Sequence, residues 1–188
     1  MKRLPKFSYG EIVPVEEIAW GSLWFRAISF HTFTLPFPVI GYDPGQVNFG
    51  WAFLSQAQGQ LFQGRLNPYR NTVERLRMTQ AAIHFLRNRH ASPLAVAVEG
   101  AAHGALYGQV PLAENRAVAV LAFSGLALDQ IRVVPPLSVR AEVFGDKKIK
   151  AEETWPQLGV YGPDGRKHYD TASALACALY ASQTFQSS

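Results

Sequence analysis

The chain has only one cysteine, Cys177, so it cannot form an intramolecular disulfide. It also has no group of cysteines and histidines with the spacing of a zinc site. These two absences exclude a disulfide framework and a zinc-binding module. They leave a reducing, cytoplasmic setting as the simplest expectation.

A long uninterrupted apolar run is missing as well. The most apolar stretch, residues 18–37, is broken by Arg26 and His31, and acidic side chains precede it where a signal peptide would be positively charged. No small-residue cleavage site follows. The sequence therefore predicts neither a secretion signal nor a membrane span, and no membrane partner is expected.

Charge and length set broad limits on function. The formal net charge of the 188 residues is +4, a modest basic excess that suits a polyanionic partner without requiring one. Hydrophobic residues make up 48% of the chain, enough for one domain with a proper core. Two full domains would not fit comfortably in this length.

Hydrophobic patterning predicts a mixed α/β sheet flanked by helices. Residues 1–37 read as an N-terminal extension of unknown role, which ends at Pro36-Phe37-Pro38, and one domain covers 38–185. Its first three strands are close together and should form an antiparallel meander. The expected strands are 39–43, 50–54, 60–66, 94–98 and 131–134, and the expected helices are 71–89, 112–129 and 169–182.

Three acidic residues stand at informative places in this pattern. Asp43 ends the first core strand, Glu99 ends the central strand, and Asp170 begins a helix that otherwise has little charge. If the two strands are parallel neighbours, both carboxylates emerge at one edge of the sheet, where open α/β sheets place their sites. The plainer interpretation is that each acid is solvated or caps a turn, with Asp170 as an ordinary N-cap.

Carboxylates that converge repel one another unless a cation lies among them. Mg²⁺ is the best fit, with Mn²⁺ as a possible substitute, because it prefers oxygen ligands and leaves positions open to water and phosphate. Two such ions about 4 Å apart can hold both the attacking and the leaving oxygen of a phosphodiester. We therefore expect two magnesium ions and phosphodiester hydrolysis.

Three segments, in order, resemble RuvC-type Holliday junction resolvases of the RNase H-like superfamily. Ile40-Gly-Tyr-Asp-Pro-Gly45 followed by Phe49-Gly-Trp-Ala52 is similar to that family's opening strand-turn-strand. Ala95-Val-Ala-Val-Glu99 is similar to its strand with a catalytic terminal Glu, and residues 170–179 to its closing helix. The resemblance spans residues 39–182 and implies an RNase H-like domain with a mixed five-stranded sheet.

The resemblance implies that Asp43, Glu99 and Asp170 are the catalytic acids and metal ligands of a crossover junction endodeoxyribonuclease acting in DNA recombination and repair. The closing motif departs from the family pattern, because Ser173 stands where many relatives have Asp. Either Ser173 contributes only through its hydroxyl or a water, or Asp170 is the principal ligand with His168 or Lys167 beside it. His168 is a secondary candidate ligand, since a lone histidine is more often structural or exposed.

The resemblance also implies DNA contacts between the central and last helices. Arg140, Lys147, Lys148 and Lys150 are the candidates there, although a solvated basic loop is the plainer interpretation. Tyr107, in the glycine-rich loop after Glu99, is a candidate for stacking on an unpaired base, or equally for packing under that loop.

A four-way junction has two-fold symmetry, so paired cuts predict a homodimer. Two surfaces are candidates for its interface, an apolar helix face and the aromatic extension. The alternatives are that the helix face is buried in the core of the protomer and that the extension covers the sheet. The candidates on the helix face are Val118, Leu121, Ala122 and Leu126, and those in the extension are Trp20, Trp24 and Phe25.

The sequence also allows comparison with three other classes of function. A related RNase H-like nuclease acting on RNA or on non-branched DNA would use the same metal chemistry. Actin-like ATPases and sugar kinases share the opening Asp-x-Gly turn, but they need two lobes, and this chain is too short for both. A non-catalytic junction-binding protein is the third alternative, and retention of all three acids argues against it.

Overall fold

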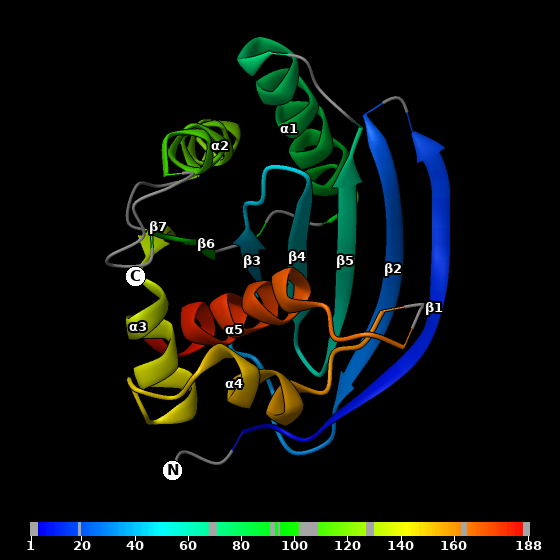
Figure 1. The fold of residues 1–188 in the computed structure, drawn as a ribbon. Coiled ribbons are helices and arrows are strands. Elements are labelled where there is room, and N and C mark those ends of the chain that lie inside the picture. Colours follow the sequence, from blue (N-terminus) through cyan, green and yellow to red (C-terminus); the bar gives the residue numbers. More distant parts are fainter. Residues whose placement is uncertain are drawn as a thin grey trace.

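The computed structural model describes residues 4–18, 20–67, 71–90, 93, 95–101, 109–126, 130–162 and 165–185. They form a seven-stranded mixed sheet with helices against both of its faces (Figure 1). Across the sheet the strands follow the order β1-β2-β5-β4-β3-β6-β7. The expected α/β class, a mixed sheet flanked by helices, is confirmed.

The centre of the sheet follows the sequence pattern closely. β3 (Val39–Asp43), β4 (Asn48–Ser55) and β5 (Gln58–Leu66) form the predicted antiparallel meander. β6 (Ala95–Glu99) pairs in parallel with β3, and β7 (Ile131–Val134) pairs in parallel with β6. The described residues of β6 before Glu99 are all buried, as expected for a strand covered on both faces.

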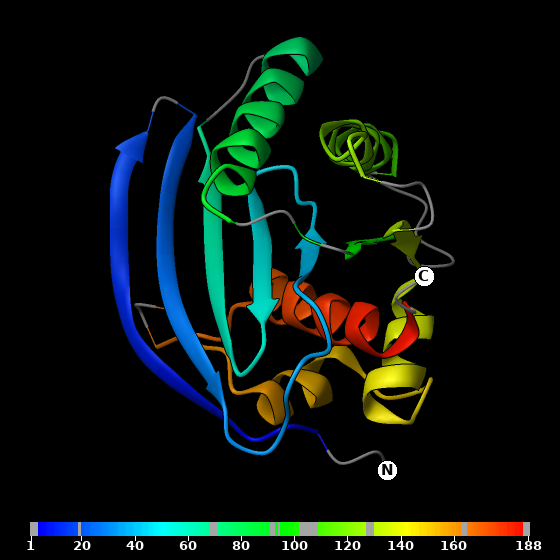
Figure 2. The same ribbon diagram turned by 180° about the vertical axis from the view of Figure 1, so that it is seen from behind.

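The helices cover the two faces unequally. α1 (Thr72–Arg87) and α2 (Gln109–Ala122) lie over one face, where an aromatic core surrounds Trp51 (Figure 2). The other face is covered by α3 (Pro136–Val139), a π-helical turn η2 (Arg140–Phe144), α4 (Ala151–Leu158) and α5 (Tyr169–Thr184). These elements bury Gly41, Ala52 and the other small residues of that face.

The N-terminal extension belongs to the same sheet. β1 (Phe7–Ile18) and β2 (Gly21–Phe30) form an antiparallel hairpin, and β2 pairs with β5 from Gly21 to Ser29. The sheet therefore has seven strands instead of five. Sequence reasoning left this segment unassigned because both hairpin strands carry polar and apolar residues in an irregular alternation, interrupted by shifts of register.

Two other expectations need correction. α2 ends at Ala122 and not near residue 129, because a turn follows at Phe123–Leu126 around Ser124 and Gly125 while Phe123 stays buried. Residues 127–129 of the expected helix lie outside the described residues. The plainer interpretation of the segment that begins at Arg140, a solvated basic loop, is wrong for its first part, because Arg140 begins η2, a direct continuation of α3. The turn ends at Gly145, whose φ of 75° is the left-handed conformation that favours glycine.

α5 lies directly on the sheet because two glycines make room for it. A Cβ on Gly41 would come within 1.9 Å of the Ala174 carbonyl oxygen, and one on Gly50 within 1.9 Å of the Asp170 carbonyl oxygen. The alanine-rich sequence of α5 complements this close approach. This packing brings the first turn of α5 over the ends of the central strands.

Among the described residues, no helix is long and apolar enough to cross a membrane. Cys177 is buried in α5 as a free thiol.

Candidate active site

Two carboxylates meet at the end of the central parallel strands. β3 and β6 run in register with Tyr42 beside Val98, so the next residues, Asp43 and Glu99, leave the same edge of the sheet. Their carboxyl groups share a hydrogen bond. The expectation that these two strands are parallel neighbours is confirmed, and it explains why residues far apart in sequence are adjacent here.

Asp170 approaches the same edge from the first turn of α5. Its backbone rests on Gly50 of β4, the residue paired with Asp43. Its side chain is oriented by β5: Gln63 donates through Nε2 to the Asp170 carboxylate at 3.3 Å, and Thr171 donates to the Gln63 amide oxygen. Gln63 is itself buried, so this orientation is well fixed.

The three acids disfavour each other's negative charge. Burial raises the pKa of Asp43 well above its ordinary value, and the charges of Glu99 and Asp170 add to that rise. Burial also raises the pKa of Glu99, and the charge of Asp170 reinforces it. The pKa of Asp170 is raised by burial, against an opposing effect of the hydrogen bond from Gln63 and the charge of His168. Such a site gains stability from a proton or a cation.

Ser173 lies one helical turn after Asp170 and takes part in the site through its hydroxyl. A hydrogen bond between Ser173 and the Asp43 carboxyl lowers the pKa of Asp43 and so favours its charged form. His168 precedes α5, and its ring meets the edge of the Trp24 ring at a centroid distance of 5.4 Å. Its charge acts on Asp170, but its ring packs against the hairpin.

Two arginines also face the acids. Arg116 of α2 donates through Nε to the Glu99 carbonyl oxygen at 3.0 Å and through Nη2 to the Gly100 carbonyl oxygen at 3.2 Å. The charges of Arg116 and Arg140 both lower the pKa of Glu99. Arg140, Glu99 and Ser173 line a small cavity of about 30 Å³ beneath the acids. Arg140 therefore lies beside the site, whereas Arg116 and Gln63 were missed by sequence reasoning.

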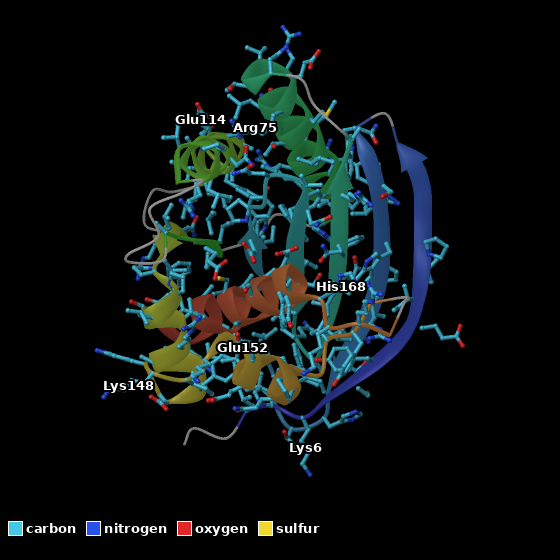
Figure 3. The ribbon with its side chains drawn as sticks, viewed as in Figure 1. Lys6, Arg75, Glu114, Lys148, Glu152 and His168 are labelled. Carbon is cyan, nitrogen blue, oxygen red and sulfur yellow. The ribbon has the colours of Figure 1, made fainter. Side chains whose placement is uncertain are left out.

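The turn after Asp43 is held from the other face of the sheet. Asn115, fully buried in α2, donates to the Gly45 carbonyl oxygen at 2.7 Å. Arg75 of α1 binds Asn115 and forms a salt bridge with Glu114 of α2 (Figure 3). This network links both helices to the turn that follows the Asp43 carboxylate. An arginine within an amphipathic helix gives no sequence signal for such a role.

The three predicted lysines lie apart from the acids. Lys147, Lys148 and Lys150 are exposed in the segment after η2, and Lys148 points outward from the molecule (Figure 3). The Lys148 backbone N–H donates to the Asp146 carboxylate at 2.8 Å, which orders the turn. Tyr107, the candidate stacking residue, lies outside the described residues.

Two of the three acids fit a divalent cation that prefers oxygen ligands. Asp43 and Glu99 offer carboxylate oxygens close together, and burial leaves their charges poorly compensated. Within the described part of the chain, however, no three His, Cys, Asp or Glu side chains lie close enough to hold one ion together. The structure thus brings Asp43 and Glu99 into contact and leaves Asp170 nearby, hydrogen-bonded to Gln63.

The fold is similar to that of RuvC from Thermus thermophilus. One solved RuvC structure matches with a TM-score of 0.59 and 21% identity over 76% of this chain and 92% of that chain. T. thermophilus RuvC in complex with Holliday junction substrate matches with a TM-score of 0.54 and 24% identity over 77% and 92%. No protein-family model matches, and neither does any curated protein in a sequence search. The chain therefore has a RuvC-type, RNase H-like fold.

Proposed function

We propose that this protein is a metal-dependent endonuclease that resolves four-way DNA junctions. The observation that carries the proposal is the contact between the Asp43 and Glu99 carboxyls, at the ends of parallel strands, with Asp170 near both. A fold shared with RuvC, whose complex with a Holliday junction substrate is known, supports DNA junctions as the substrate class.

Asp43, Glu99 and Asp170 are the proposed ligands of Mg²⁺, or of Mn²⁺ in its place. When bound, one or two such ions would supply Lewis-acid activation of the scissile phosphate and a lowered pKa for the attacking water. Asp43 and Glu99 would hold the ion as charged carboxylates, and Asp170, which accepts a hydrogen bond from Gln63 in this structure, would be the third ligand. The Ser173 hydroxyl favours the charged form of Asp43, against the larger effect of burial.

The remaining polar groups position the reacting strand. Arg116 and Arg140 balance the carboxylate charge on either side of Glu99, which reduces repulsion between the site and a phosphodiester. Exposed Lys147, Lys148 and Lys150 are proposed to contact phosphates further along the DNA. His168 is retained as a neighbour of Asp170 and is not needed as a ligand.

The test replaces each acid by its amide. Asp43→Asn, Glu99→Gln and Asp170→Asn should each reduce cleavage of a four-way junction by about 100-fold or more, because a metal ligand is worth several kcal/mol in the transition state. Junction binding should stay close to that of the unmodified protein, since phosphate contacts are untouched. Undiminished cleavage by any variant would remove that residue from the site.

A related nuclease that acts on RNA or on non-branched DNA remains the rival enzyme. It would use the same acids, so the same variants do not separate it from a resolvase. Matched substrates do: a four-way junction, a duplex and an RNA–DNA hybrid of the same sequence. Calorimetry with Mg²⁺ distinguishes a non-catalytic junction-binding protein, whose site should show no heat of binding.

A further inference from the structure

A line of side chains crosses the sheet from the acids to the N-terminal hairpin. Asp43 of β3 pairs with Gly50 of β4, Gly50 pairs with Gln63 of β5, and Gln63 pairs with Trp24 of β2. Residues directly opposite one another in antiparallel strands point to the same face. Asp43, Gln63 and Trp24 therefore lie on the face that carries α5.

A second line runs beside the first. Asn48 of β4 pairs with Arg65 of β5, and Arg65 pairs with Ser22 of β2. Five residues of these two lines form the floor of a groove of about 520 Å³, and its wall is the segment 167–170 that leads into α5. The floor residues are Ser22, Trp24, Asn48, Gln63 and Arg65. Among the described residues that line this groove, Asp170 is the one acid, and it also belongs to the candidate active site. The groove is thus continuous with that site.

The hairpin contacts both the wall of the groove and the chain that leads into it. The Tyr9 hydroxyl donates to the Leu158 carbonyl oxygen, and Arg26 donates through Nη1 to the Tyr161 carbonyl oxygen at 3.1 Å. The His168 ring packs edge-on against Trp24 at a centroid distance of 5.4 Å and closely over Gly162. Without β1 and β2, Ser22 and Trp24 of the floor and all of these hairpin contacts would be missing.

We propose that this groove binds the DNA strand that continues from the scissile phosphate. The inference rests on the proposed nuclease function and names the surface that guides its substrate. Arg65 and Lys167 are exposed, line the groove, and form no salt bridge with any described residue. Their charges complement phosphates, and the partly exposed Trp24 ring offers a stacking surface for a base.

The dimensions agree with this occupant. Three steps between neighbouring strands separate Asp43 from Trp24, which at about 4.8 Å each is about 14 Å. A stacked strand advances about 3.4 Å per nucleotide, so about four nucleotides span the surface from Asp43 to Trp24. The N-terminal extension thereby acquires a role, which is to lengthen the substrate-binding surface on one side of the site.

The first measurement is the dependence of junction binding on salt, by fluorescence anisotropy in a chelating buffer that prevents cleavage. The double variant Arg65→Gln/Lys167→Gln should lower the slope of log K against log salt by about 1.4 to 1.8, because two phosphate contacts are lost. The matched control is Lys6→Gln/Arg77→Gln, which removes two exposed cations outside the groove and should leave the slope unchanged. Equal slopes for the two double variants would overturn the proposal.

A second measurement tests the aromatic floor. Trp24→Ala should weaken binding about fivefold to 100-fold, and Trp24→Phe should restore most of it, because the stacking surface returns. Circular dichroism shows whether either protein is folded. If Trp24→Ala is unfolded, the salt dependence of binding by Arg65→Gln/Lys167→Gln is the measurement that tests the proposal.

The outcomes separate this proposal from the function on which it rests. If junctions are cut normally and the groove and control variants have equal salt slopes, the groove does not bind DNA, and the proposed nuclease function stands. If the groove variant has a reduced salt slope but the unmodified protein cuts no junction, the groove binds DNA, and the proposed nuclease function is wrong. A slope that changes only with an RNA version of the junction refutes DNA as the occupant.

Discussion

At the residue scale, the Asp43 and Glu99 carboxyls share a hydrogen bond in surroundings that raise the pKa of both. A bound cation should relieve this unfavourable charge. We expect Mg²⁺ at ten times its dissociation constant to stabilise the fold by about 1.4 kcal/mol. That corresponds to a rise in Tm of about 3 to 6 °C, measured by differential scanning calorimetry.

Asp43→Asn is the matched variant for this measurement. Because it removes one of the three acids whose charges repel one another, we expect a higher Tm than the unmodified protein in chelator at pH 8 and little further change with Mg²⁺. An equal Mg²⁺-dependent rise in both proteins would mean that the ion binds elsewhere.

His90 supplies a pH test that does not involve the acids. Its ring stacks on Phe53 and its Nε2 accepts a hydrogen bond from Trp51 at 3.2 Å, which requires the neutral form. Burial lowers the pKa of His90 to about 4, with a contribution from Arg89. The unfolded chain takes up this proton first, near pH 6.5, so the stability contributed by neutral His90 is lost as pH falls from 6.5 to 4.

Chemical denaturation at pH 7.5 and pH 5 checks this expectation. The free energy of unfolding should fall less over that interval in His90→Gln than in the unmodified protein, since glutamine does not titrate. An identical fall in both proteins would show that other groups account for the acid sensitivity.

The sequence predicted the acids better than their surroundings. Asp43 and Glu99 could be found because each is a charged residue at the carboxyl end of an otherwise apolar strand. The carboxyl ends of neighbouring parallel strands lie at the same edge of a sheet. Gln63 and Arg116 could not, because one is a polar residue within a strand and the other an arginine within a helix. Their roles depend on which strand and helix lie beside the acids, and only the three-dimensional arrangement determines that.

At the element scale, the position of α5 depends on glycines that allow contact between backbones. A Cβ on Gly41 would lie 1.9 Å from the Ala174 carbonyl oxygen and 2.4 Å from the Ala178 nitrogen, neither of which can move independently. Gly41→Ala should therefore cost about 3 kcal/mol or more of the free energy of unfolding. Gly10→Ala is the control, because its Cβ would meet Ala27 at an ordinary 3.5 Å. Equal effects in urea denaturation would contradict this account of the packing.

Elements with a regular hydrophobic period were predicted well, and irregular ones were not. β3 and β7 have the predicted bounds, and α1 and α5 differ from them by a few residues. The β1–β2 hairpin was missed because register shifts interrupt its alternation, and its stability comes from pairing with β5. α4 was missed as well, since it contains Pro156, a residue that argues against a helix.

At the scale of the whole molecule, most of the residues that the sequence suggested for a dimer interface are buried within the protomer. Ala122 is buried, and Val118 and Leu126 pack against the core, so only Leu121 of that helix face is exposed, at 69%. Trp20 is buried and Phe25 packs on the same core, because the extension joins the edge of the sheet as the β1–β2 hairpin instead of covering one of its faces. The outer surface of α2 also exposes Val110 at 69%.

We still expect a homodimer, because the junction has two-fold symmetry and paired cuts need two sites. The exposed apolar residues of α2 are the best remaining candidates for its interface. Leu121→Glu should shift the protein toward the monomer in light scattering across a concentration series. Val133→Glu, at an exposed position on β7, is the control and should leave the mass unchanged. A protein that stays monomeric with junction DNA yet makes paired cuts would contradict the symmetry argument.

Cleavage of a synthetic four-way junction tests the central claim most directly. The unmodified protein with Mg²⁺ should nick two opposing strands at symmetry-related positions, and it should leave a duplex of the same sequence intact. Chelation of the metal or the Asp43→Asn substitution should abolish both nicks while the junction stays bound. Undiminished nicking by Asp43→Asn, or equal cutting of the duplex, would contradict the account.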